Sequence, residues 1–139
     1  MAHCYQFGRQ NTYLDGELKM DGTSTRSLLA WYEVINSKFF YGELPANVIV
    51  RWTVPEDNEN DIAATSTPCK NPRYSYLIVM NREKLASRSQ KLSALLHEMI
   101  HVATGVRDCH GPAFDDWHQK MMDRGAFRKG ALIKNVTLF

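Results

Sequence analysis

The sequence lacks the features that mark several broad classes of protein. It contains no CxxC pair, and its cysteines are an odd three: Cys4, Cys69 and Cys109. This excludes a disulfide framework and indicates reduced thiols. No apolar run reaches the roughly 18 residues that suggest a transmembrane helix, and the N-terminal segment has no apolar signal-peptide core. We therefore expect a cytoplasmic protein, or a nuclear one in a host with a nucleus, and no membrane partner.

A strong charge of one sign is also missing. Lys and Arg number 17 against 15 Asp and Glu, which gives a net charge of +2. This balance neither requires nor excludes a nucleic-acid partner. Hydrophobic residues make up 44% of the 139 positions, enough for one core without disulfides. The composition predicts a single globular domain and leaves the oligomeric state open.

The hydrophobic pattern predicts an α+β fold. Apolar residues recur at helical spacing in three stretches, and β-branched and aromatic residues gather in three shorter ones. Helices are expected from the capping residues 23–25 to about 41, from about 89 to 104 and from 112 to 124, and strands at 48–54, 62–67 and 74–80. Short links between the strands indicate a small, mainly antiparallel sheet, with two helices packed on it and the third completing a site.

The chain divides into three parts on the same pattern. Residues 1–22 are polar and form an N-terminal extension, 23–125 form the core, and 126–139 form a C-terminal tail. The apolar end of that tail could add a further strand.

The second expected helix contains His97-Glu98-Met99-Ile100-His101, an HExxH motif. Residues four apart lie on one helix face, about one turn from each other. Two imidazoles so placed can bind one zinc ion. Glu98 lies beside them, where a carboxylate can take a proton from a water and pass it to a leaving amine. Because the rest of this helix is apolar nearly all round, a surface helix with incidental histidines is the poorer interpretation.

A catalytic zinc site needs a third protein ligand and one open position. His110 lies in the link before the third expected helix, where the chain can double back toward the motif. His118 is the competitor. It shares a helix face with Asp115 and could orient a ligand, contact the substrate or lie at the surface. The metzincin pattern is excluded, because Thr104 and Arg107 stand where it needs Gly and His.

Four segments of the chain follow one another in a recognisable order. They are the first helix with its exit Gly42-Glu43-Leu44-Pro45, the strand pair within 62–80, the stretch Leu95–His101, and His110-Gly111-Pro112-x-Phe114. In this order they resemble the SprT-like zinc metallopeptidase family, which includes the Spartan-type proteases. The resemblance covers about residues 24–124, and HExxH followed by HGPxF is its specific part. It implies a zincin-like fold, Zn²⁺ held by His97, His101 and His110, and Glu98 as the base.

The function that the resemblance implies is zinc-dependent cleavage of a protein or peptide substrate, which would align as an added strand along the sheet edge. Cleavage of DNA-bound or DNA-crosslinked proteins is a family-level expectation, with DNA as a candidate partner. The cysteine pairs of the zinc ribbon that many relatives carry are missing from this sequence. The basic segments 70–91 and 124–134, with Tyr74 and Tyr76 interleaved, would bind DNA without reading bases. An ordinary solvated basic surface is the competing interpretation.

Two interpretations from other classes stay open. One is a non-catalytic zinc module with a fourth ligand, Cys109 or His118. The other is a basic nucleic-acid-binding domain with a structural metal. Both leave Glu98 without a role, since a structural site has no need of a carboxylate beside a water position. The oxyanion stabiliser also stays open among Arg107, Tyr74 and His118.

Overall fold

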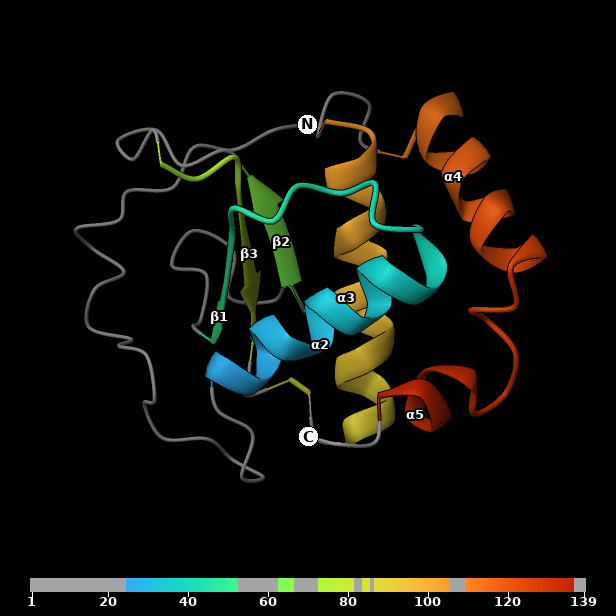
Figure 1. Ribbon diagram of the computed structural model, residues 1–139, viewed down its shortest axis with the longest axis horizontal. Helices are drawn as coiled ribbons and strands as arrows, with labels where there is room; N and C mark the ends of the chain where they lie inside the picture. Colours follow the sequence, from blue (N-terminus) through green and yellow to red (C-terminus); the bar gives the residue numbers. More distant parts are fainter. Residues whose placement is uncertain are drawn as a thin grey trace.

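A three-stranded sheet with helices packed on it forms the framework of the protein (Figure 1). The computed structural model describes residues 25–52, 63–66, 73–81, 84–85, 87–105 and 110–136. The expected N-terminal extension, the three cysteines and Arg107 lie outside these residues. Among the described helices, none has the length and apolar character to cross a membrane.

Helix α2, Thr25–Phe39, follows the predicted helical spacing and buries its apolar stripe. Its end is held by side-chain contacts with the Gly42–Pro45 exit. The Asn36 amide donates to the carbonyl of Leu44 and accepts from its N–H, both at 3.1 Å, and the Tyr32 hydroxyl donates to the Pro45 carbonyl at 2.6 Å. The helix therefore leads into β1 along a fixed path. The buried stripe is Leu28, Trp31, Tyr32, Ile35 and Phe39.

The strands are β1, Val48–Trp52, β2, Ala63–Ser66, and β3, Tyr76–Met80, in the spatial order β1-β3-β2. The α+β class is confirmed, but the prediction of a mainly antiparallel sheet is wrong. β1 pairs with β3 in parallel, whereas β2 pairs with β3 antiparallel. A parallel pair needs a connection of a dozen or more residues, and the whole segment 53–75, β2 included, supplies it. The most apolar strand, β3, thereby takes the central and most buried position.

Helix α3, Arg88–Ala103, packs on β2 and β3 beside α2, which packs on β1. It begins with a capping box, in which the Ser87 hydroxyl accepts from the Gln90 N–H and the Gln90 side chain accepts from the Ser87 N–H. It stops at Thr104 and Gly105, whose positive φ of 74° suits glycine. The helix is consequently fixed along its length against the sheet. Its buried apolar residues are Leu92, Leu95, Leu96, Met99, Ile100 and Val102.

Two helices complete the fold, α4, Pro112–Asp123, and α5, Ala131–Asn135. The prediction of an added strand in the tail is wrong, because α5 occupies that segment. Gly130 enters it with a φ of 77°, and Leu132 and Val136, four residues apart, are buried in the core. The α5 helix packs on α2 and α3 at the side of the molecule that Figure 1 shows in red. A strand would have placed these two residues on the sheet rather than between helices.

Arg124 ties the end of α4 to the end of α2. Its Nη1 donates to the Phe39 carbonyl at 2.6 Å, and its guanidinium lies 3.9 Å from the centre of the Tyr41 ring. A charge-assisted hydrogen bond to a helix-terminal carbonyl satisfies an otherwise orphaned acceptor. Arg124, one of the cations of the basic segment 124–134, therefore has a structural role in joining two helices.

The packing of α5 generates a stability prediction. Leu132→Ala removes a buried side chain from the core and should lower the free energy of unfolding by about 2–4 kcal/mol. The matched change Ile133→Ala, on the same helix at a residue that is 39% exposed, should cost roughly 0.5 kcal/mol or less. Urea unfolding measures both. Equal costs for the two variants would contradict the assignment of Leu132 to the core.

Candidate metal centre

Three histidine rings converge at one point between α3 and α4. His97 and His101 come from successive turns of α3, and His110 comes from the residue pair before α4. One ring nitrogen from each lies within 4.8 Å of the others. The ring centres are 5.0 Å apart for His97 and His101, 5.2 Å for His97 and His110, and 5.0 Å for His101 and His110. The structure thus brings together all three histidines predicted as ligands.

The geometry of this histidine triad fits a single metal ion. The Nε2 atoms of His97 and His110 are 3.2 Å apart. Two nitrogens that bind one tetrahedral zinc at 2.0–2.1 Å stand roughly 3.3 Å apart, so this pair needs almost no adjustment. Three imidazoles match the ligand set of a catalytic zinc site, which keeps a fourth position open. The triad could therefore hold a metal ion.

The start of α4 places His110. Gly111 is the N-cap and Pro112 the first helical residue, so the chain turns sharply at this point. Phe114 follows in the first turn and is buried. Its ring lies 5.1 Å from His97, 4.8 Å from His101 and 4.8 Å from His110, measured between ring centres. Phe114, the last residue of the HGPxF stretch, therefore forms an apolar wall beside all three imidazoles.

Burial also sets the protonation of the two histidines on α3. It is the main cause that lowers the pKa of His97, followed by the neighbouring His110 and His118. The pKa of His101 falls to about 4, again through burial first and then through His97 and His110. Near pH 7 both rings are therefore neutral, which is the form that binds a metal.

Glu98 follows His97 on α3 and contacts the edge strand β2. It is 6% exposed, and its Oε1 accepts a hydrogen bond of 2.6 Å from the hydroxyl of Thr65. Thr65 belongs to β2 and is itself buried. Glu98 stands outside the group of three that could hold a metal. Nothing in the sequence pattern pointed to Thr65, because the partner of Glu98 lies 33 residues away in a short strand.

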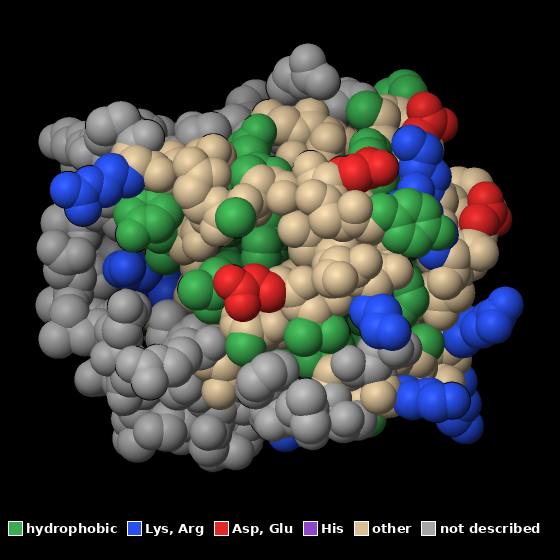
Figure 2. Space-filling model, in the orientation of Figure 1, with side chains coloured by type: hydrophobic (Ala, Val, Ile, Leu, Met, Phe, Trp, Pro, Cys, Tyr) green, Lys and Arg blue, Asp and Glu red, His purple; other side chains and the backbone are tan. Residues whose placement is uncertain are grey.

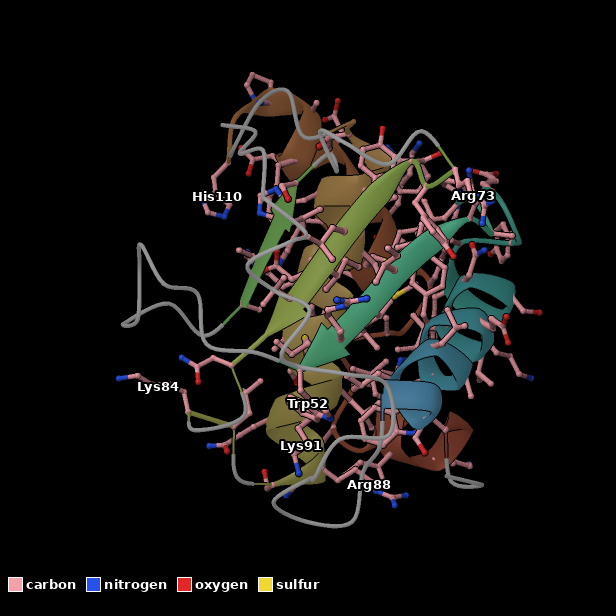
Figure 3. The ribbon with its side chains drawn as sticks, turned by 90° about the vertical axis from the view of Figure 1, so that its left-hand side faces the viewer. Trp52, Arg73, Lys84, Arg88, Lys91 and His110 are labelled. Atoms are coloured by element: carbon pink, nitrogen blue, oxygen red, sulfur yellow. The ribbon has the colours of Figure 1, made fainter. Side chains whose placement is uncertain are left out.

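His118 takes a different position from the triad. Its ring stacks on Phe127 at 4.5 Å and lies 6.1 Å from Phe114, measured between ring centres. Phe114 thus contacts both His118 and the triad, His118 is outside the group of three that could hold a metal, and it is the last of the causes that lower the pKa of His97. Of the other residues considered for the site, Cys109 and Arg107 lie outside the described residues. Figure 3 shows His110 on the side of the sheet where β2 forms the edge.

The comparison with known protein families gives one result. A model of the SprT-like family matches residues 28–134. This range includes all three histidines of the triad and every described strand. No curated protein and no solved structure matches the chain.

The geometry predicts that replacing His110 and replacing His118 affect metal binding differently. His110→Ala removes one nitrogen of the triad and should leave most of the protein without zinc after dialysis. His118→Ala removes a ring that stacks on Phe127 and should retain about one zinc per chain. Metal analysis of the two purified proteins measures the difference. Equal zinc retention would reverse the assignment of the third ligand.

Proposed function

The chain belongs to the SprT-like family, and on that premise we propose that it is a zinc-dependent endopeptidase. The observation that carries the proposal is the buried Glu98 carboxylate beside three converging histidines. A site built only to hold a metal has no use for a buried carboxylate that stays outside the ligand group. Burying that charge also costs free energy unless the carboxylate is hydrogen-bonded. A carboxylate kept in this position despite the cost indicates a functional role.

His97, His101 and His110 would hold the zinc, each through one ring nitrogen. When bound, zinc supplies Lewis-acid polarisation of a carbonyl and makes a water more acidic. The rings of His97 and His101 contribute no charge, since burial lowers the pKa of both and keeps them neutral. The positive charge of the ion would therefore remain largely undiminished at the site, which suits this chemistry.

Glu98 performs the proton transfer in this proposal. Its carboxylate accepts a proton from the attacking water and then donates it to the amine of the leaving peptide. The α3 backbone places Glu98 one residue after the first ligand, on the helix that carries both His97 and His101. Because Glu98 is buried, bulk water competes little for its oxygen atoms.

Strand β2 offers a place for the substrate. In the described part of the chain it pairs with β3 on one side only, so it forms an edge of the sheet. An extended peptide can add to such an edge through backbone hydrogen bonds. Since Thr65 of β2 contacts Glu98, a peptide aligned on this strand would pass close to the proposed base.

The metallopeptidase proposal generates a direct test. Glu98→Gln preserves the shape of the side chain and an oxygen that can accept from Thr65, but it removes the basic carboxylate. Hydrolysis of a protein substrate should fall by about 10²–10⁴-fold, while zinc content and melting temperature stay near the wild-type values. Glu33→Gln makes the same chemical change at an exposed position of α2 and serves as the control.

The competing function, a non-catalytic zinc module, makes the opposite prediction. It requires zinc binding with no hydrolysis by the wild type, and the same zinc content in Glu98→Gln. A Glu98→Gln protein that turns over substrate at the wild-type rate would exclude the proposed mechanism.

We also propose that protein substrates held on DNA are brought to the site by a small basic surface. Arg128, Lys129 and Lys134 are exposed near α5, and Figure 2 shows several Lys and Arg side chains on the α4 and α5 side of the visible face. Within the expected basic segments, Arg124 is hydrogen-bonded to α2 and Lys91 is buried, so fewer cations remain to contact DNA. The exposed cations support phosphate contacts without base reading.

DNA binding of this kind is measured by its salt dependence. The binding constant falls as salt concentration rises, because each phosphate contact releases counterions. Replacing Arg128, Lys129 and Lys134 together by Ala should make the negative slope of log K against log salt concentration shallower by up to roughly 3. Lys38→Ala, an exposed cation on α2, should leave the slope nearly unchanged. A wild type that binds neither single-stranded nor duplex DNA at low salt, yet cleaves free protein, would remove DNA from the proposal.

A further inference from the structure

We propose that Thr65 is a positioning residue, whose hydroxyl holds the Glu98 carboxylate in the orientation that proton transfer requires. The inference rests on the proposed peptidase function, since it assigns a task within that reaction. It concerns only residues of this chain and depends on a contact between the edge strand β2 and helix α3.

The contact is short and buried on both sides. Thr65 Oγ1 lies 2.6 Å from Glu98 Oε1 and 3.3 Å from the Glu98 carbonyl oxygen. A threonine hydroxyl carries one proton, so the shorter distance identifies the carboxylate as its acceptor, with the carbonyl as a weaker second neighbour. Thr65 is 7% exposed and Glu98 is 6% exposed. A hydrogen bond to a charged acceptor in such surroundings is stronger than the same bond in water.

This bond constrains the carboxylate in a way that the helix alone does not. Three rotatable bonds separate the Glu98 backbone from its carboxylate, and the last of them rotates broadly. A hydroxyl that fixes Oε1 also fixes the plane of the group, and with it the direction of the other oxygen. Because proton transfer depends on distance and alignment, a base held in one orientation transfers protons faster than a rotating one.

Thr65 also couples the base to the proposed substrate strand. Side chains alternate between the two faces along β2, and Thr65 faces α3 while the β2 backbone forms the sheet edge. A peptide added to that edge and the Glu98 carboxylate would therefore share one rigid element as their reference. Any displacement of β2 relative to α3 would misalign both together.

The neighbouring Ser66 provides a matched control. Its hydroxyl is also fully buried in β2, and it has no hydrogen-bond partner in the described part of the protein. Ser66→Ala removes a hydroxyl from the same strand, one residue along and on the opposite face. An effect common to Ser66→Ala and the Thr65 variants would therefore report damage to the strand.

The experiment compares kcat, KM and zinc affinity of the wild type with those of Thr65→Val, Thr65→Ser and Ser66→Ala. Thr65→Val should lower kcat by about 10–100-fold with little change in KM, since misplacement of a reacting group costs roughly this much. Thr65→Ser keeps the hydroxyl and should restore most of kcat. Ser66→Ala should behave as the wild type, and zinc affinity should be equal in all four proteins.

A second measurement avoids activity altogether. In the metal-free protein, the carboxyl carbon of Glu98 gives a resonance that is assigned by its loss in Glu98→Gln. This resonance should shift in Thr65→Val, return in Thr65→Ser and stay in place in Ser66→Ala. Thermal unfolding checks that each variant folds, and Thr65→Ala serves as the alternative if the valine variant does not.

The possible outcomes separate the inference from the peptidase proposal. Wild-type kcat in Thr65→Val, no rescue by Thr65→Ser, or an equal loss in Ser66→Ala would each overturn the positioning role. A wild type without any hydrolysis would instead contradict the peptidase. In that case a shifted resonance in Thr65→Val would still establish the contact, and an unshifted one would reject it.

Discussion

Burying a carboxylate where α3 meets β2 is the constraint on which the site depends. An ionised side chain loses hydration inside a protein, so the fold must supply a partner in its place. The hydroxyl of Thr65 does so for Glu98 at 2.6 Å. This partner exists only if α3 lies tightly across β2, which in turn requires the apolar face of α3 to be fully packed on the sheet. The capping box at Ser87 and the stop at Gly105 fix the ends of that helix.

The same packing gives the two histidines of α3 their properties. A helix whose other faces are buried presents His97 and His101 on the face that remains, and α4 closes over it with His110 and Phe114. Burial lowers the pKa values of the α3 pair, so the rings stay neutral and keep their lone pairs for a metal. The apolar ring of Phe114 fills the space that polar side chains or solvent would otherwise occupy. Site chemistry and core packing are therefore parts of one arrangement.

The topology of the sheet determines what can reach this site. Because β3 takes the centre of the described sheet, β2 forms an edge of it even though it precedes β3 in the chain. This edge strand and the central strand β3 are the two strands on which α3 packs. An all-antiparallel meander would have placed β2 in the middle of the sheet and closed its edge to a peptide. In the proposed function, the parallel pairing of β1 with β3 thus leaves β2 at the edge where a substrate would add.

Residue spacing alone predicted the helices, the strands, the HExxH pair and its carboxylate, because these depend on periods of 3.6 and 2 within short stretches. The place of His110 in the link before α4, together with the resemblance to the SprT-like family, made it the expected third ligand with His118 as the competitor. The structure brings His110 to the two histidines of α3. The strand order, the α5 helix and the contacts of Thr65 and Phe114 had no local signature. They were decided by the tertiary structure, since each depends on which distant surfaces meet when the core closes.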